Sequence, residues 1–230
     1  MFTILLLLAA GPAAVMLVYV YRRDRIEKEP LSLLLKLLFG GLPAIVCSFF
    51  VELLLGMLIG AVMNTQTMAY ILVDNFIGVA LVEEFFKFLF LKLFSWKNPN
   101  FDYFYDGVIY SICVAIGFAV LENIMYIFQY GFATGIIRGL TFVPGHFGFA
   151  VFMGIFYAKA RRCANRGMDA AAGICLFLAV LCPTILHGIY DSVLSINLWW
   201  TLLIFLAFVI IMYITVFRLI KKTSDEDQPI

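Results

Sequence analysis

The sequence predicts an all-α membrane protein, a polytopic bundle of about seven transmembrane helices. Hydrophobic residues make up 64% of the 230 residues and charged residues only 13%, with a mean hydropathy of +1.02. Soluble domains are about 45–50% apolar and about 25% charged, so water is not the main solvent of this chain. The apolar residues also gather in runs of about 20, the length that crosses a bilayer. We therefore expect one membrane domain over residues 1–230.

Seven apolar runs are long enough to be spans, and short polar linkers separate them. Basic residues follow the first run rather than precede it, which favours a retained helix over a cleaved signal peptide. Residues 31–39 should form a short interfacial helix, ended by the Gly-Gly-x-Pro sequence at 40–43. The helices that carry sequence motifs fall within about 70–194, and the seven spans lie near residues 2–20, 42–62, 70–92, 107–130, 139–158, 171–194 and 199–219.

Lysine and arginine indicate the orientation of the bundle. They are frequent in linkers 21–30, 92–105 and 159–170 and in the C-terminal tail. The alternate linkers contain one basic residue, Arg138. Because basic linkers stay on the cytoplasmic side, the N-terminus is predicted outside and the C-terminus in the cytoplasm. The expected partner of the protein is the lipid bilayer. A net charge of +1 gives no reason to expect a nucleic-acid partner.

Ionisable residues are unusually numerous within the predicted spans. A charged group at membrane depth costs about 2.5–3.5 kcal/mol even on lenient insertion scales, so such groups face protein or water. Both histidines of the chain are among them. The set comprises Glu52, Asp74, Glu83, Glu84, Lys87, Glu122, His146, His187 and Asp191.

Helical spacing pairs several of these groups. Lys87 lies about 40° around the helix from Glu83 and about 60° from Glu84, so it can partner either acid. His187 and Asp191 are four residues apart and meet on one helix face, where the aspartate would fix the imidazole tautomer.

The remaining groups lie on two further predicted helices. Phe118 and Glu122 are also four residues apart, with Asn123 beside Glu122. His146 follows Pro144-Gly145, where a broken helix could open onto a cavity. By span position, Glu84 is placed near mid-membrane, Glu122 and His187 in the outer half, and His146 and Asp191 near the outer boundary. A shared water-filled pocket in the outer half is the simplest interpretation.

At these residues the chain resembles the PrsW-type intramembrane proteases, relatives of the type II CAAX prenyl endopeptidases and of other membrane-embedded glutamate proteases. The resemblance covers residues 80–192. It rests on three motifs in order within apolar spans: EExxK at Glu83-Glu84-x-x-Lys87, FxxxE at Phe118-x-x-x-Glu122, and HxxxD at His187-x-x-x-Asp191. His146 in its Pro-Gly-His context is a further shared feature. The prenyl endopeptidases carry histidine in place of Glu122, which argues against prenylated substrates.

The resemblance implies that the protein is a hydrolase of the bacterial plasma membrane that cuts a membrane-anchored protein. In this family the reaction is typically the first cut in a single-span anti-sigma factor, which starts a stress response. Glu84 would then be the general base, tuned by Glu83 or Lys87. His187, held by Asp191, would be the acid–base partner or a donor to the oxyanion. His146 and Glu122 would complete the site, with Lys87, Phe118 and Asn123 in support.

Other interpretations of the same residues remain open. Carboxylate–histidine chains also build proton relays, so a proton-coupled transporter or channel is the alternative function, although the chain shows no related halves. His146 fits a capping or gating role nearly as well as a catalytic one, and Glu52 and Asp74 match no motif. Two histidines and several glutamates could bind zinc, but no HExxH helix is present. The sequence therefore favours a metal-free site without a cofactor.

The predicted orientation can be tested by cysteine labelling. Single cysteines at Asn64 and Asn197, in a background without the five native cysteines, should react with membrane-impermeant thiol reagents applied from outside. A cysteine at Asn165 should react only after the membrane is permeabilised. The reverse pattern would overturn the orientation and the depths inferred from it.

Overall fold

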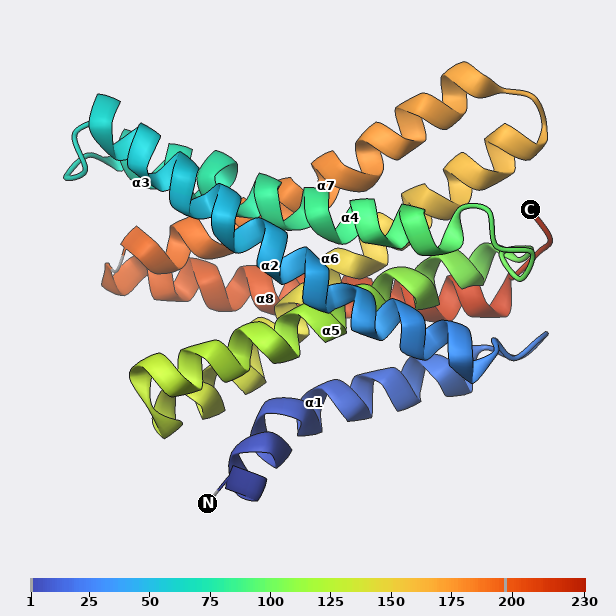
Figure 1. Cartoon of the computed structure of the whole chain (residues 1–230), viewed down its shortest axis with the longest axis horizontal. Coiled ribbons are helices and arrows are strands. Elements are labelled where there is room, and N and C mark those ends of the chain that lie inside the picture. The colour runs from blue at the N-terminus through green and yellow to red at the C-terminus, as the bar shows by residue number, and fades with distance from the viewer. Residues whose placement is uncertain (1, 197) are drawn as a thin grey trace.

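The computed structural model describes the backbone of residues 2–196 and 198–230, and the side chains from residue 10 onward; Asn197 lies outside the described residues. Within these ranges the chain is helical with no strand, which confirms the predicted all-α class (Figure 1). α3, a π-helical segment η1 and α4 run on without a break, so the described residues form seven continuous helices. The elements are α1 (Phe2–Arg23), α2 (Leu31–Val62), α3 (Met68–Val73), η1 (Asp74–Ala80), α4 (Leu81–Ser95), α5 (Phe104–Tyr130), α6 (Phe132–Asn165), α7 (Asp169–Ile196) and α8 (Trp199–Asp225).

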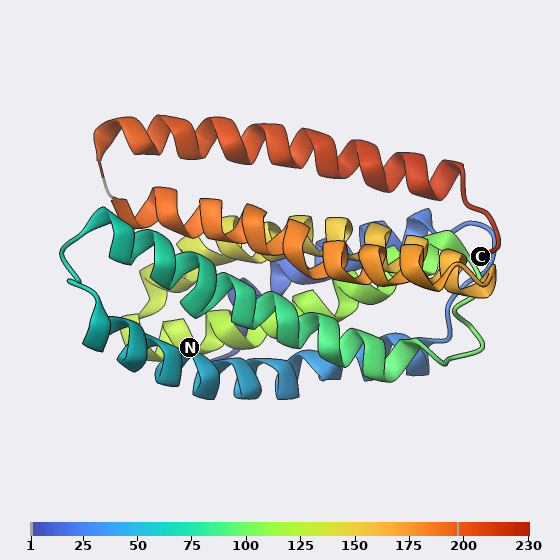
Figure 2. The ribbon, with the colours of Figure 1, turned by 90° about the horizontal axis from the view of Figure 1, so that it is seen from above.

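Five of these helices, α2, α5, α6, α7 and α8, are long and apolar enough to cross a membrane. The chain is therefore a multi-pass membrane protein, while seven spans and the orientation of the termini stay predictions. α5 and α6 form the buried centre of the bundle, and α2 and α8 expose most of their surface. Figure 2 shows α8 along one side of the bundle and α2 along the opposite side.

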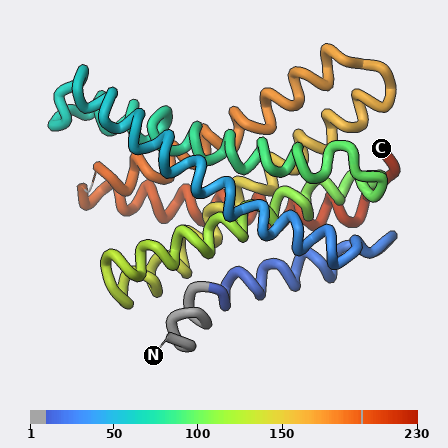
Figure 3. The backbone as a smooth tube through the Cα atoms, viewed as in Figure 1, coloured from blue at the N-terminus to red at the C-terminus, as the bar shows by residue number. Residues whose placement is uncertain are grey.

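The predicted short helix at 31–39 is wrong, because α2 continues unbroken from Leu31 to Val62 through the Gly-Gly-x-Pro sequence. Gly41 lies directly against the backbone of Gly117 and Phe118 on α5, and a Cβ atom there would collide with it. The glycines therefore permit a close crossing of α2 over α5, which can be followed in the trace of Figure 3.

The predicted break before His146 is also wrong. α6 passes through Pro144 and Gly145 as one helix that begins at Phe132, not near residue 139. His146 is consequently near the middle of a 34-residue helix rather than near the outer boundary of the bundle. The tight α5–α6 connection explains the early start, because Gly131 alone separates the two helices with φ of +89°, a conformation that favours glycine.

Two local features of the backbone bring α4 and α7 together. The π-helical turns of η1 directly precede α4, and extra residues per turn change which side chains face inward. The ring of Phe76 on η1 packs against Gly188 of α7, where a Cβ atom would overlap it. Because Gly188 follows His187, this contact holds that histidine next to the acidic start of α4.

The close crossing of α2 and α5 gives a stability prediction with a control on the same helix. Gly41→Ala should lower the free energy of unfolding by about 1–3 kcal/mol, the usual effect of overpacking. Gly56→Ala should be neutral or slightly stabilising, because no atom lies within 4 Å of the place that its new methyl group would take. Thermal unfolding in one detergent measures both, and equal unfolding temperatures for the two variants would contradict the crossing.

Candidate active site

Eight ionisable side chains from four helices meet in one buried cluster, which we call the acid–base cluster. Three come from the start of α4, one from α5, two from α6 and two from α7. His146 contacts Lys87, so it lies at the same height in the bundle as the start of α4. The prediction that His146 lies near the outer boundary is therefore wrong. The members of the cluster are Glu83, Glu84, Lys87, Glu122, Arg138, His146, His187 and Asp191.

The Lys87 ammonium lies at the centre of the cluster. Its Nζ is 2.9 Å from Glu83 Oε2, 2.9 Å from Glu84 Oε1 and 2.9 Å from His146 Nδ1. The side chain is only 1% exposed, and its ammonium lies 4.1 Å from the centre of the Phe118 ring. A buried ammonium is tolerated only where charges and hydrogen bonds satisfy it, and here three acceptors do so.

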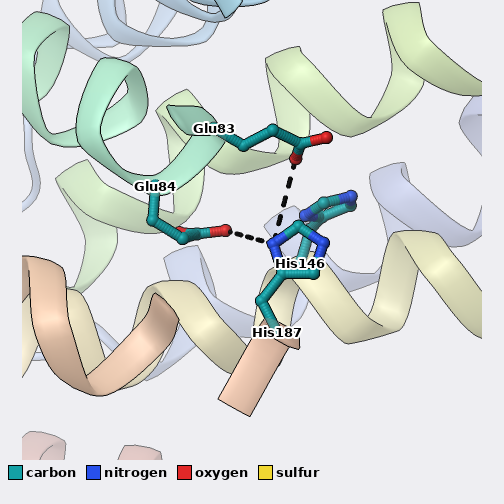
Figure 4. Close-up of side chains that lie close together, drawn as sticks. All are labelled: Glu83, Glu84, His146 and His187. Atoms are coloured by element: carbon teal, nitrogen blue, oxygen red, sulfur yellow. Dashed lines mark hydrogen bonds and ion pairs between the residues drawn. The ribbon is translucent and has the colours of Figure 1, made fainter. Parts of the chain in front are cut away.

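His187 bridges two carboxylates. Its Nδ1 is 3.0 Å from Glu84 Oε1 and its Nε2 is 3.1 Å from Asp191 Oδ2, so the pairing with Asp191 expected from their spacing is present. Figure 4 shows the ring turned toward Glu83 and Glu84. Ionised carboxylates only accept hydrogen bonds, so with Glu84 and Asp191 ionised each ring nitrogen of His187 carries a proton. The ring also stacks on Phe149, with centroids 5.0 Å apart.

His146 has one acceptor and one donor nitrogen, whereas both nitrogens of His187 face carboxylates. Its Nδ1 faces Lys87, and an ammonium only donates, so Nδ1 must be the acceptor. Its Nε2 is 3.0 Å from Glu122 Oε2 and carries the proton that this carboxylate accepts. The rings of His146 and His187 lie 5.0 Å apart and nearly perpendicular.

Arg138 is the cluster member that the sequence did not reveal. Its guanidinium donates to Glu122 Oε1 and lies between the rings of Tyr126 and Phe142, 3.6 Å and 4.0 Å from their centres. The predicted span began at residue 139, which assigned Arg138 to a linker. The excess of acids over bases in the predicted spans was the signal that a second buried cation was needed.

The other predicted residues lie around the cluster rather than in it. Phe118 covers Lys87 and packs near His146, with ring centroids 5.8 Å apart. Asn123 is buried and donates to Gly135 O at 3.3 Å, so it joins α5 to α6 without contacting the cluster. Glu52 of α2 lines the adjoining cavity, and its buried Oε1 has no hydrogen-bond partner among the described residues.

A cavity of about 400 Å³ adjoins the cluster. α2, η1, α4, α5, α6 and α7 all line it, and Glu83, His146 and His187 are among its walls, while Glu84 is not. Phe49 on α2 and Met125 on α5 line the cavity and are also about half exposed. Partly exposed side chains of α2 and α5 therefore form part of the cavity wall.

Four donor atoms of the cluster could hold a metal ion. One atom from each of Glu83, Glu84, His146 and His187 lies within 4.8 Å of the others, and all four residues are buried. Imidazole nitrogen and carboxylate oxygen are ligands that zinc accepts, so the donor set fits in kind. The Lys87 ammonium contacts three of these four donors, however, so Lys87 and an ion compete for the same place.

The helical membrane fold and the buried carboxylate–histidine cluster beside a cavity define a membrane-embedded enzyme. A family model described as PrsW family intramembrane metalloprotease matches residues 29–218. The chain belongs to this family and is a peptidase of the bacterial cell membrane, which acts on membrane proteins.

Curated relatives agree with this assignment. The chain is 33% identical to Protease PrsW of Geobacillus kaustophilus over 196 residues, which cover 84% of this chain and 82% of the relative. It is 30% identical to Protease PrsW of Oceanobacillus iheyensis over 221 residues (95% and 96%) and 33% identical to that of Clostridioides difficile over 213 residues (91% and 87%). No solved structure matches the chain.

The position of the cavity predicts where a substrate touches the enzyme. A photoreactive amino acid at Phe49 should cross-link to a membrane-protein substrate held by an enzyme variant that binds it without cutting it. The same probe at Phe50, which is 64% exposed and does not line the cavity, should cross-link mainly to lipid. Gel shifts and mass spectrometry identify the products. Equal yields of substrate adduct at both positions would place the substrate elsewhere.

Proposed function

We propose that the acid–base cluster hydrolyses a peptide bond by carboxylate activation of water, with the Lys87 ammonium rather than a metal ion as the central cation. The observation that carries this proposal is the contact of Lys87 Nζ with three donors that an ion would otherwise use. The transporter alternative gains no support from the comparisons, since the three relatives described above are proteases.

The two adjacent glutamates have different surroundings, which supports different roles. Glu84 is 1% exposed, and its Oε1 is shared by Lys87 and His187. Glu83 also contacts Lys87 but lines the cavity, where a water could reach it. We therefore assign the general base to Glu83 and the holding of Lys87 and His187 to Glu84, the reverse of the roles expected from the sequence.

The reaction follows from this assignment. Glu83 takes a proton from a water in the cavity while the water oxygen forms a bond to the scissile carbonyl carbon. His187 lines the cavity with a proton on each ring nitrogen, so its positive charge stabilises the oxyanion that develops. Glu83 then gives its proton to the amide nitrogen as the carbon–nitrogen bond breaks, which leaves a free amine and a carboxyl group.

If an ion displaced Lys87, Glu83, Glu84, His146 and His187 would be the residues that hold it. Zinc at this place would polarise the scissile carbonyl and lower the pKa of a nearby water. Three of the four groups would suffice to bind it, which would leave one carboxylate as the proton acceptor.

The substrate is proposed to be a single-span membrane protein, and an anti-sigma factor in a stress response is the particular class that we propose. This class comes from the resemblance of the motifs, and the partly exposed Phe49 and Met125 in the cavity wall support lateral access from the membrane. With the predicted orientation, cleavage would fall in the extracytoplasmic juxtamembrane segment or in the outer turns of the substrate's span. Mass mapping of the two fragments locates the cut.

The roles of the two glutamates can be separated by pairing activity with stability. Glu83→Gln should abolish cleavage of a single-span fusion protein and lower the unfolding temperature less than Glu84→Gln does, because Glu83 lies within hydrogen-bond distance of Lys87 but not of His187. Glu84→Gln should abolish cleavage and also lower stability by about 3–5 kcal/mol, since it removes a charged partner of buried Lys87 and His187. His187→Ala should be inactive as well. Substantial activity in Glu83→Gln would refute the assigned base.

The central cation can be tested by metal removal. The purified enzyme should keep its peptidase activity after exhaustive chelation, and its zinc content by mass spectrometry should be well below one ion per chain. Lys87→Met, which frees the donors, should take up more zinc than Lys87→Arg, which keeps the positive charge. Activity that is lost on chelation and restored by one equivalent of zinc would show that an ion, not Lys87, is the working cation.

A further inference from the structure

Arg138 is a buried guanidinium whose position is fixed on three sides. It is 6% exposed and lies between the faces of Tyr126 and Phe142. Among the described residues, Glu122 is the only carboxylate that forms an ion pair with Arg138, and the Arg138 Nε has no hydrogen-bond partner. Arginine suits such a site better than lysine, since the planar group stacks on rings while it donates at its edge.

Glu122 transmits this restraint to His146. One carboxylate oxygen accepts from Arg138, and the other accepts from His146 Nε2 at 3.0 Å. A carboxylate that faces Nε2 holds the proton on that nitrogen, which leaves Nδ1 with a free lone pair. That lone pair is the third acceptor for the Lys87 ammonium. A continuous series of contacts thus runs from Arg138 through Glu122 and His146 to Lys87.

We propose that Arg138 is a positioning residue, which orients Glu122 so that His146 stays in its Nε2–H tautomer and accepts from Lys87. This inference rests on the proposed function for its catalytic consequence, but not for the tautomer itself. Without Arg138, only His146 would hold the Glu122 carboxylate in place. The carboxylate could then turn away from Nε2, and the imidazole would lose the contact that fixes its orientation and tautomer.

The tautomer can be observed directly, because the chain has only two histidines. NMR of a metal-depleted sample labelled with ¹⁵N-histidine gives signals from the ring nitrogens. Comparison with the spectrum of His187→Gln shows which signals belong to His146. In the wild type, His146 should show a protonated Nε2 and an unprotonated Nδ1. In Arg138→Gln this pattern should be lost, and Arg138→Lys should retain it in part. Identical His146 signals in the wild type and Arg138→Gln would overturn the inference.

Kinetics on a single-span fusion protein that the wild type cleaves test the catalytic consequence. Arg138→Gln should lower kcat roughly 10- to 100-fold with little change in KM, the effect expected when a group that orients a site histidine is removed. Because Arg138 acts through Glu122, the double variant with Glu122→Gln should be no slower than Glu122→Gln alone. Losses that multiply in the double variant would contradict the proposal.

Arg161→Gln is the matched control. Arg161 is also on α6, lies near the Trp96 and Phe101 rings and has an unpartnered Nε, but it forms no ion pair among the described residues. Its variant should keep both the wild-type kcat and the His146 signals. Absence of Glu83-dependent cleavage in the wild type would refute the proposed function alone, while the nitrogen signals still decide whether Arg138 sets the tautomer.

Discussion

The burial of the Lys87 ammonium is the constraint on which the rest of the structure depends. A charge at this depth is tolerated only when acceptors surround it, and no single helix supplies enough of them. Glu83 and Glu84 come from its own helix at i−4 and i−3, but His146 must come from α6. The energetic need to satisfy one ammonium therefore requires α4 and α6 to pack together, and α7 joins them because Glu84 also faces His187.

The helix crossings provide the geometry that this cluster requires. Gly41 lets α2 lie on the α5 backbone, and Gly188 lets Phe76 lie on α7. Neither glycine contributes a side chain to the cluster, yet each sets the distance between helices that carry or enclose it. Small residues at close crossings are the usual means of helix association in lipid, where burial of apolar surface drives little packing. Precise placement of the acids thus depends on contacts made by uncharged residues.

The sequence was sufficient to predict the helices and most of the cluster, because buried charges are conspicuous in apolar runs and i, i+4 spacing is local. Lys87 with its two glutamates and His187 with Asp191 are pairs of this kind. Contacts between helices were not predictable in this way. The contact of Lys87 with His146 on α6 and the pairing of Glu122 with Arg138 depend on how neighbouring helices align. Because Gly131 allows α6 to begin at Phe132, Arg138 lies inside this helix and not in a linker. Glycine and proline inside α2 and α6 were also ambiguous, since the same residues permit a close crossing or a break.

The composition of the acid–base cluster has a consequence for the timing of charge during a turnover. With its four carboxylates ionised, the cluster carries four negative charges against three positive ones, on Lys87, Arg138 and the doubly protonated His187. The resting site therefore has a surplus of one electron charge in a medium of low dielectric constant. Transfer of a proton from water to Glu83 moves this surplus from the glutamate to the oxyanion of the bound substrate. The first chemical step thus leaves the net charge of the occupied site unchanged, and no additional charge has to be placed in the low-dielectric surroundings.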